Sequence, residues 1–265
     1  MSDVAPGRRD VVPAERRRQI LEELRQRGSV TVGTVEELFN VSPMTARRDL
    51  ALLAEAGYAR RTHGGAVLPD LAAHEDSFDS RLGHGVEAKR RIAAAVVATL
   101  GPRETVFIDS SSSAYYIVRE MIETGLSATI LTNSVPVMNI VGKGGASDLD
   151  LIGLGGNFRK LTRSLVGADT VRAIQGFYVD RVVFSVKGIE ADGSLTDPDP
   201  LESEVKRAMI SRARTVVLVA DAQKFGERGL NVVAHARNVD NAWLADPPLD
   251  GVAILESAGV AVTEV

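Results

Sequence analysis

Helical and strand-like segments alternate from Val86 onward, and this alternation limits the possible fold more than any other feature of the sequence. Apolar residues at helical spacing predict helices over residues 87–100, 114–124, 135–141 and 202–212. Short runs rich in apolar and β-branched residues predict strands over residues 105–108, 128–131, 149–154, 181–185 and 215–220. Strands that alternate with helices build a parallel sheet with crossover helices. We therefore expect a Rossmann-like, mostly parallel α/β domain over residues 86–265.

Small polar residues and glycines follow the first four of these strands. The groups are Asp109 with Ser110, Ser111, Ser112 and Ser113, then Thr132 with Asn133, then Gly155 with Gly156, and then Lys187. Open α/β sheets bind their ligands at the carboxyl ends of the strands. Four serines that lead into a helix offer hydroxyls, backbone amides and the positive end of the helix dipole to an anion. The pattern indicates a pocket for a phosphate or a polyol, and the alternative interpretation is a set of ordinary loops and helix caps.

The first 68 residues show a different pattern, in which short helices are joined by tight turns. Residues 14–27 form an amphipathic stretch behind a proline, and residues 35–39 form a second one. Ser42 can cap a helix and Pro43 suits its first position, so a third helix is expected over residues 43–56. This order of elements is typical of a helix-turn-helix.

The third helix has one apolar face and one polar face. At about 100° per residue, Ala46, Leu50 and Leu53 lie within one stripe. The exposed and flanking positions are occupied by Met44, Thr45, Arg47 and Arg48. Side chains in the N-terminal half of such a helix reach base edges when the helix lies in the major groove of DNA.

Two short strands around a glycine turn follow the third helix. The segment Tyr58–Thr62 carries Arg60 and Arg61, and residues 66–68 follow Gly64-Gly65. This is the pattern of a wing, whose arginines suit contact with phosphates or with the minor groove. We therefore predict a winged helix-turn-helix domain over residues 13–68.

Charge supports this division of the chain only through its distribution. The net charge is −4, but residues 1–68 carry eleven arginines and no lysine against nine acidic residues. Guanidinium groups suit bidentate contact with phosphates and guanine edges, although a solvated arginine-rich surface is the alternative interpretation.

Other composition features limit the chemistry. The chain has no cysteine and only four histidines, so we expect no disulfide, no thiolate nucleophile, no metal site and no cofactor. It has no long apolar run, so we expect a cytoplasmic protein without a membrane partner.

The N-terminal region resembles the signature of the DeoR-type transcriptional regulators in the run Val41-Ser42-x-x-Thr45-x-Arg47-Arg48-Asp49-Leu50-x-x-Leu53, followed by Gly57 and Arg61-x-His63-Gly64-Gly65-Ala66. The resemblance implies repression of an operon, usually one for sugar uptake or catabolism, through a double-stranded DNA operator. The expected DNA contacts are Ser42, Met44, Thr45, Arg47, Arg48, Arg60, Arg61 and His63.

The rear domain resembles the DeoR effector domain in Thr196-Asp197-Pro198, Glu202-x-Glu204-x-Lys206 and Asp221-Ala222-Gln223-Lys224-Phe225-Gly226. The implied fold is similar to ribose-phosphate isomerase and CoA-transferase-like domains, in which the Asp, Ser/Thr-rich loop, Thr-Asn, Gly-Gly and Asp-x-x-Lys segments line a sugar-phosphate site. The implied effector contacts are Asp109, Ser110, Ser111, Ser112, Ser113, Thr132, Asn133, Gly155, Gly156, Asp221 and Lys224, with Lys187, Glu204 and Lys206 as further candidates. Ser111 replaces the glycine of the family's Asp-x-Gly-Thr-Thr, so the effector is left open between a sugar and a sugar phosphate.

Residues 69–85 lack clear periodicity and are expected to be an exposed linker between the two domains. A repressor that reads paired half-sites is expected to be a homodimer or a homotetramer. The competing hypothesis is a sugar-phosphate isomerase with an N-terminal helical module, in which Asp109, Glu204 or Asp221 acts as the base. The first hypothesis makes the chain a switchable regulator without enzymatic activity.

Overall fold

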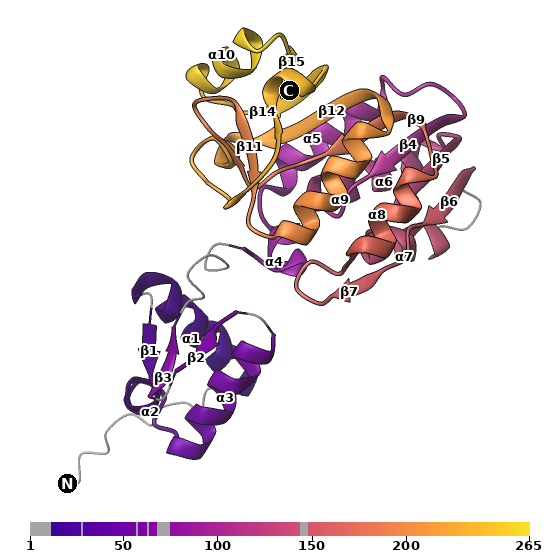
Figure 1. Cartoon of the computed structure of the whole chain (residues 1–265). Helices are drawn as coiled ribbons and strands as arrows, with labels where there is room; N and C mark the ends of the chain where they lie inside the picture. The colour runs from indigo at the N-terminus through magenta and orange to yellow at the C-terminus, as the bar shows by residue number, and fades with distance from the viewer. Residues whose placement is uncertain (1–11, 28, 57, 63, 68–74, 144–147) are drawn as a thin grey trace, which may run out of the picture. The chain divides into compact units, whose positions relative to one another are not determined.

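The computed structural model describes residues 12–265 apart from residues 28, 57, 63, 68–74 and 144–147. Its contacts divide the chain into two compact units, Met1–His74 and Glu75–Val265 (Figure 1). Within the described residues, every helix is too short or too polar to cross a bilayer.

The N-terminal unit is a small three-helix core with a three-stranded antiparallel sheet. Its elements are α1 (Pro13–Arg27), β1 (Ser29–Thr31), α2 (Val32–Phe39), α3 (Pro43–Glu55), β2 (Arg60–Arg61) and β3 (Gly65–Val67). The sheet has the order β1-β3-β2, and its β2–β3 hairpin is the expected wing. The apolar stripe predicted for α3 is buried, because Ala46 and Leu50 are 0% exposed and Leu53 is 5% exposed. The winged helix-turn-helix prediction is therefore confirmed.

Local chemistry explains where α3 begins and why β1 exists. Ser42 is the N-cap of α3, where its side chain accepts a hydrogen bond from the Thr45 amide, and Pro43 occupies the first turn. Residues 29–31, between the first two helices, form a strand that was not predicted, and Val30 of this strand pairs with Ala66. A Cβ atom on Gly65 would lie 2.2 Å from the Val30 carbonyl oxygen, so only glycine allows these two strands to approach.

The rear unit is built on a seven-stranded parallel sheet. Its strands, in spatial order, are β15 (Ala261–Glu264), β14 (Asn241–Ala245), β12 (Ala213–Asp221), β9 (Val179–Phe184), β4 (Glu104–Ile108), β5 (Ala128–Thr132) and β6 (Leu149–Gly153). Every neighbouring pair in this sheet is parallel. The mostly parallel α/β prediction is therefore confirmed.

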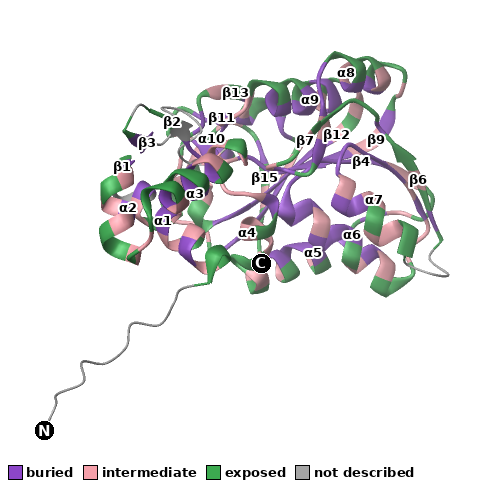
Figure 2. Cartoon of the chain, turned by 90° about the horizontal axis from the view of Figure 1, so that it is seen from below, coloured by how far each residue is buried: buried purple, intermediate pink, exposed green. Residues whose placement is uncertain are grey.

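Helices cover both faces of the sheet, as Figure 2 shows nearly edge-on. One face packs against α5 (Val86–Val97), α6 (Ser112–Thr124) and α7 (Val135–Lys143), and the other against α8 (Ala168–Gln175), α9 (Pro200–Ser211) and α10 (Leu249–Ser257). Alternate strand residues supply the two cores, with Val106 and Ile108 on the first face and Phe107 on the second. The strands are therefore apolar on both sides, which is typical of a parallel sheet.

Several elements of the rear unit were not predicted. They are the hairpin of β7 (Asn157–Arg159) and β8 (Ser164–Val166), the small sheet of β10 (Gly188–Ile189), β11 (Ser194–Asp197) and β13 (Asn231–His235), the short helices η1 (Ala222–Phe225) and η2 (Ala236–Asn238), and also α8, β14, α10 and β15. Most of these strands have two to five residues, too few for a clear alternation of apolar and polar positions.

The linker expected over residues 69–85 is corrected for its second half. Residues 68–74 lie outside the described residues, but Phe78–Gly83 form the helix α4, capped by Ser77. Phe78 is 1% exposed, and its amide donates to the Leu161 carbonyl at 2.9 Å. The buried aromatic ring makes this segment part of the rear unit.

The order of the strands also creates a crevice. The chain runs outward through β4, β5 and β6, returns to β9 on the other side of β4, and then continues outward through β12, β14 and β15. The strand order reverses between β4 and β9, and at such a point the loops that leave two adjacent strands diverge to opposite faces of the sheet. Asp109 follows β4 and Ser185 follows β9, so both residues lie at the reversal.

Candidate functional site

The exposed face of α3 is the candidate nucleic-acid surface. Met44 is 73% exposed, Arg47 and Arg48 are exposed, and Thr45 is half-buried. Within the described part of the chain, neither arginine forms an ion pair with a carboxylate. These guanidinium groups therefore keep their donors for an external partner.

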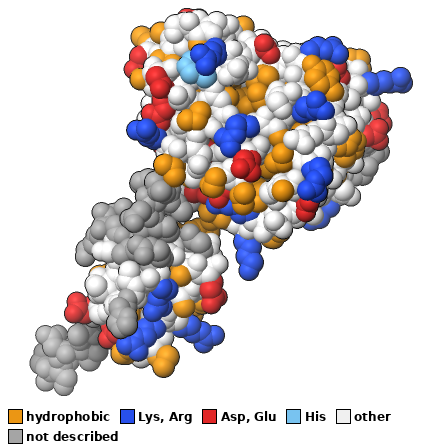
Figure 3. All heavy atoms as spheres, in the orientation of Figure 1, with side chains coloured by type: hydrophobic (Ala, Val, Ile, Leu, Met, Phe, Trp, Pro, Cys, Tyr) orange, Lys and Arg blue, Asp and Glu red, His pale blue; other side chains and the backbone are white. Residues whose placement is uncertain are grey.

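The arginines of α1 have a different role. Arg16 contacts the carboxylate of Asp49 at 2.6 Å and Arg17 contacts it at 3.3 Å, and Asp49 is only 3% exposed. Arg18 pairs with Glu15 and Glu22 on the surface of the same helix. Figure 3 shows basic side chains gathered on one side of the N-terminal unit. Arg16 and Arg17 therefore hold α1 to α3, whereas Arg47 and Arg48 of α3 face outward.

The wing supports α3 as well as extending from it. The Arg61 guanidinium donates to the Arg47 carbonyl at 2.8 Å, so this hydrogen bond holds the wing against α3. The Ser42 hydroxyl already accepts the N-cap hydrogen bond of α3, and it also lies 3.0 Å from the hydroxyl of Thr45. The side chain of Arg60 and the whole of His63 lie outside the described residues.

A polar cavity lies at the strand reversal of the rear unit. It is lined by Glu75, Asp76, Arg81, His84, Lys89, Ser110, Ser111, Ser112, Ser113, Thr162, Ser185, Val186, Lys187, Asp197, Pro198, Glu202, Lys206, Asp221, Gln223, Lys224 and Glu227. The residues come from the ends of β4, β9 and β12, from α9, and from the segment around α4. The arrangement places both cationic and anionic groups around one small-molecule site.

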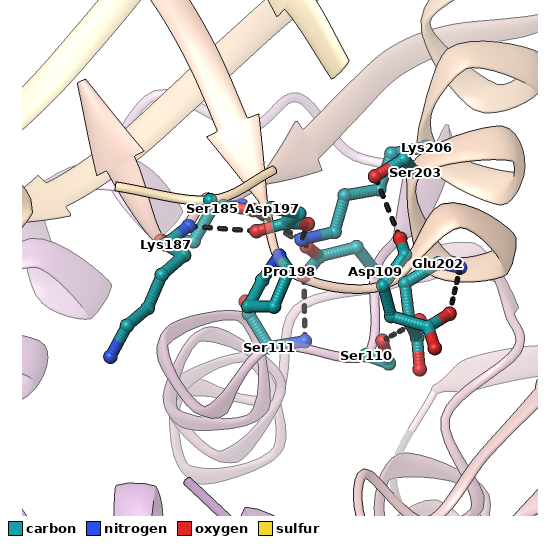
Figure 4. Close-up of polar contacts among 12 residues, drawn as sticks. Asp109, Ser110, Ser111, Ser185, Lys187, Asp197, Pro198, Glu202, Ser203 and Lys206 are labelled. Atoms are coloured by element: carbon teal, nitrogen blue, oxygen red, sulfur yellow. Dashed lines mark hydrogen bonds and ion pairs between the residues drawn. The ribbon is translucent and has the colours of Figure 1, made fainter. Parts of the chain in front are cut away.

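One wall of the cavity is a buried ionic cluster around Lys206 (Figure 4). The Lys206 ammonium lies 2.5 Å from an oxygen of Asp197 and 3.4 Å from one of Asp109, and it donates to the Ser185 carbonyl at 2.6 Å. Burial opposes the charge, but the two carboxylates outweigh it and raise the pKa of Lys206. Asp109 also accepts from the amides of Ser111 at 2.9 Å and Ser185 at 3.1 Å. This cluster fixes the ends of β4 and β9.

Glu202 lies beside this cluster on the same face of α9. Its carboxylate accepts hydrogen bonds from the hydroxyls of Ser110, at 2.9 Å, and Ser164. Glu202 and Lys206 are one helical turn apart, whereas Glu204 is turned about 200° from Glu202 and is exposed. The cavity therefore contains Glu202 and Lys206, and the candidate Glu204 lies outside it.

The other wall carries three cations without a carboxylate within ion-pair distance among the described residues. Lys89 is 4% exposed and donates to the carbonyls of Arg81, at 2.5 Å, and His84. Burial, and then the neighbouring Lys224 and Arg81, lower the pKa of Lys89 to about 8 against the opposing effect of Asp221. Burial likewise lowers the pKa of Lys224. The Nε and Nη2 atoms of Arg81 are buried without a hydrogen-bond partner. The cations and free donors of this wall suit the binding of an anion.

The serine run lies at the end of the site that suits an anion. Ser111 caps α6, and its hydroxyl accepts from the Ala114 amide at 3.1 Å. Its φ of −74° is an ordinary value for any residue, so the backbone here does not require the family's glycine. The dipole of α6 adds positive potential to that of Lys89 and Lys224.

The structure thus gathers some of the sequence-predicted residues and separates others. Ser110, Ser111, Ser112, Ser113, Lys187, Asp221 and Lys224 line the cavity, and Asp109 lies directly behind it. The Lys187 ammonium contacts Glu227 and, at 3.9 Å, Asp76.

Four residues serve the fold elsewhere. The Thr132 hydroxyl accepts from the Ser134 amide, and the Asn133 side chain donates to the Leu165 carbonyl. The Gly155 carbonyl accepts from the Thr170 hydroxyl. A Cβ atom on Gly156, which has a φ of 149°, would lie 2.0 Å from that hydroxyl oxygen. Close packing against α8 therefore explains Gly156, whereas a Cβ atom on Gly155 would meet nothing within 4 Å.

Sequence reasoning missed Ser185, Asp197 and Glu202 as site residues, whereas Lys206 was a weaker candidate that does line the cavity. The signal for Glu202 was present, because it shares the inner side of α9 with Lys206 and the buried Val205 and Met209. No cluster of three or more metal-ligating side chains occurs among the residues that the structure describes.

The fold and these two sites define a class of protein in which a winged helix-turn-helix unit is joined to an α/β unit with a polar cavity. Two family descriptions match the chain: the DeoR-like helix-turn-helix domain over residues 16–71 and the DeoR C-terminal sensor domain over residues 84–243. The chain therefore belongs to the DeoR family of transcriptional regulators, as its motifs predicted.

Known relatives are similar over nearly the whole chain. The glycerol-3-phosphate regulon repressor of Escherichia coli K12 is 33% identical over 88% of this chain and 91% of its own length. The putative aga operon transcriptional repressor of Escherichia coli O157:H7 is 28% identical over 98% and 97%. Ribose 5-phosphate isomerase A of Methanocaldococcus jannaschii matches 53% of this chain and 54% of its own, with 14% identity and a TM-score of 0.39, too distant to bear on activity.

Proposed function

We propose that the protein is a transcriptional repressor of a carbohydrate uptake or catabolic operon, and that a phosphorylated sugar or polyol in the rear cavity modulates its binding to DNA. The observation that carries the proposal is the capped helix α3, which presents Arg47 and Arg48, without a carboxylate partner among the described residues, beside Met44 and Thr45. The relatives support the regulatory part, because their names describe repressors of a glycerol-3-phosphate regulon and of an aga operon.

The two walls of the cavity support a phosphorylated effector. Arg81, Lys89 and Lys224 converge with the N-terminus of α6 and suit a phosphate. Asp197 and Glu202 are acceptor groups that suit the hydroxyls of a sugar or polyol. An unphosphorylated sugar would bring no negative charge to Arg81, Lys89 and Lys224, which have no carboxylate within ion-pair distance among the described residues, so we prefer the phosphorylated class.

The same function implies an oligomer that works in the cytoplasm. Two recognition helices are needed to read paired half-sites, so the repressor acts as a homodimer or a homotetramer. Its proposed partners are an operator duplex and a small-molecule effector.

The isomerase alternative has less support. Asp109 is held by Lys206 and two backbone amides, and Glu204 lies outside the cavity, so neither is placed as a free base. We therefore propose no enzymatic activity. Turnover of ribose 5-phosphate by the purified protein would restore the alternative.

Fluorescence anisotropy with the duplex upstream of the protein's own gene tests the DNA-binding part. We expect the wild-type protein to prefer this duplex to a shuffled one by about a thousandfold or more. Arg47→Ala and Arg48→Ala should each weaken specific binding about tenfold or more, because each removes a potential base-edge contact. Arg18→Ala, which removes an exposed arginine of α1, is the matched control and should retain binding. A wild-type protein without sequence preference would refute the proposal.

A further inference from the structure

The segment of residues 75–85 begins the rear unit and also forms part of the effector cavity. It contains α4 and contributes Glu75, Asp76, Arg81 and His84 to the lining. Glu75 directly follows His74, the last residue of the N-terminal unit. A ligand that moves or stiffens this segment therefore acts on the residues that directly follow the DNA-binding unit in the chain.

Most of this segment is anchored to the rear unit. Glu75 makes a two-pronged contact with Arg159, at 2.8 and 2.6 Å, and Arg159 is also 3.2 Å from Asp199. The ring of Phe78 is buried and packs edge-on against Tyr115, with ring centres 5.7 Å apart. These contacts define where the segment lies before a ligand binds.

The side chain of Arg81 has donor atoms that are not satisfied. Its Nε and Nη2 atoms are buried without a hydrogen bond to any described residue, although a guanidinium group has five donors to satisfy. The hydroxyl oxygen of Ser185, a residue that is 3% exposed and also lines the cavity, likewise has no partner among the described residues. Two unsatisfied polar groups in one cavity indicate a ligand that accepts hydrogen bonds from both sides.

Lys89 ties the backbone of α4 to the same place. Its ammonium has three donors, and two of them serve the carbonyls of Arg81 and His84 at the end of α4. The third remains for a ligand. An anion that binds Arg81 would contact the side chain of an α4 residue directly. If it also binds Lys89, it is linked to the backbone at the end of α4, because Lys89 donates to the carbonyls of Arg81 and His84.

We propose that Arg81 is an effector contact that couples the two units: the phosphate of the bound effector engages Arg81, fixes the 75–85 segment, and thereby changes the affinity of the N-terminal unit for DNA. This inference rests on the proposed function, and it adds the residue and the segment through which the effector acts.

Amide hydrogen exchange of the full chain tests the first half of the inference. The probe is the compound that binds best among inorganic phosphate, glycerol 3-phosphate, ribose 5-phosphate and glucosamine 6-phosphate. We expect it to slow exchange in residues 110–114, at the start of α6, and also in residues 77–85. In Arg81→Ala the probe should bind about ten- to a hundredfold more weakly. At saturation it should still protect residues 110–114 but no longer residues 77–85.

DNA affinity with and without saturating probe tests the second half. The ratio of the two affinities should be about fivefold or more in the wild-type protein and less than about twofold in Arg81→Ala. Asp79→Ala is the matched control on the same helix, because it removes only an exposed ion pair with Arg163. This control should keep the wild-type ratio.

The outcomes separate this inference from the proposed function. If no probe protects residues 110–114, the phosphorylated effector is refuted and the inference falls with it. If the probe protects residues 110–114 but the wild-type DNA affinity does not change, the regulatory part of the proposed function is refuted together with the inference, and only effector binding stands. If the wild-type affinity changes but Arg81→Ala keeps the wild-type ratio, coupling through Arg81 alone is refuted. The exchange of wild-type residues 77–85 remains informative even if Arg81→Ala does not fold.

Discussion

Asp49→Ala should unfold the DNA-binding unit while leaving the rear unit intact. Asp49 is 3% exposed and Arg16, its partner at 2.6 Å, is 8% exposed, so the substitution removes a buried carboxylate that Arg16 and Arg17 share. Removal of one member of a buried ion pair typically costs about 3–5 kcal/mol. The core of a unit this small rarely supplies more than about 3–5 kcal/mol, so the loss is comparable with its whole stability.

Hydrogen exchange measures this loss unit by unit in the full chain. Peptides from α1 and α3 should exchange about a hundredfold faster or more, because each 1.4 kcal/mol or so is a factor of ten. Trp243 is the only tryptophan and lies in β14, so its unchanged fluorescence would show that the rear unit is intact. Glu22→Ala, which removes an exposed carboxylate from Arg18, is the control and should exchange as the wild type does. An increase below about fivefold in Asp49→Ala would refute the role given to this buried pair.

Three further predictions concern single groups. Effector affinity, measured by calorimetry, should fall about tenfold as the pH rises through about 8. The pKa of Lys89 is lowered to about 8, so Lys89 loses its proton there while the phosphate stays doubly ionised. Lys89→Arg, whose guanidinium keeps its charge, should show no such fall. Glu202→Gln should weaken effector binding measurably by calorimetry and Glu204→Gln should not, since only Glu202 lies in the cavity; equal effects would contradict the site. Ser42→Ala should destabilise the N-terminal unit by about 1 kcal/mol in exchange experiments, and an unchanged rate would show that the cap of α3 contributes nothing.

Features set by local periodicity and capping were predictable from the sequence. The buried stripe of α3, the cap at Ser42 and the alternation of strands and helices each depend on residues a few positions apart. The pairing of Arg16 and Arg17 with Asp49 depends on residues more than thirty positions away. From the sequence alone, Arg16 and Arg17 could not be distinguished from the arginines of α3 that are expected to contact DNA, because their partner is so far away in the chain.

The effector site was predictable only in part, because the order of strands in the sheet is not local information. Parallel strands all end at one edge, which places Ser110 correctly, but the cavity forms where β4 meets β9. Thr132 ends β5 and Gly155 follows β6, and these strands lie one and two positions farther from this point. Ser185 became recognisable as a site residue only after β9 was found beside β4.

Control of DNA binding by a phosphorylated ligand in the rear cavity can be measured in a single experiment. This is an anisotropy titration of the wild-type protein with its upstream duplex, repeated at saturating concentrations of the best-binding phosphorylated probe. We expect specific binding that changes by about fivefold or more when the probe is present. Binding that lacks sequence preference, or a probe that occupies the cavity without changing DNA affinity, would contradict this expectation.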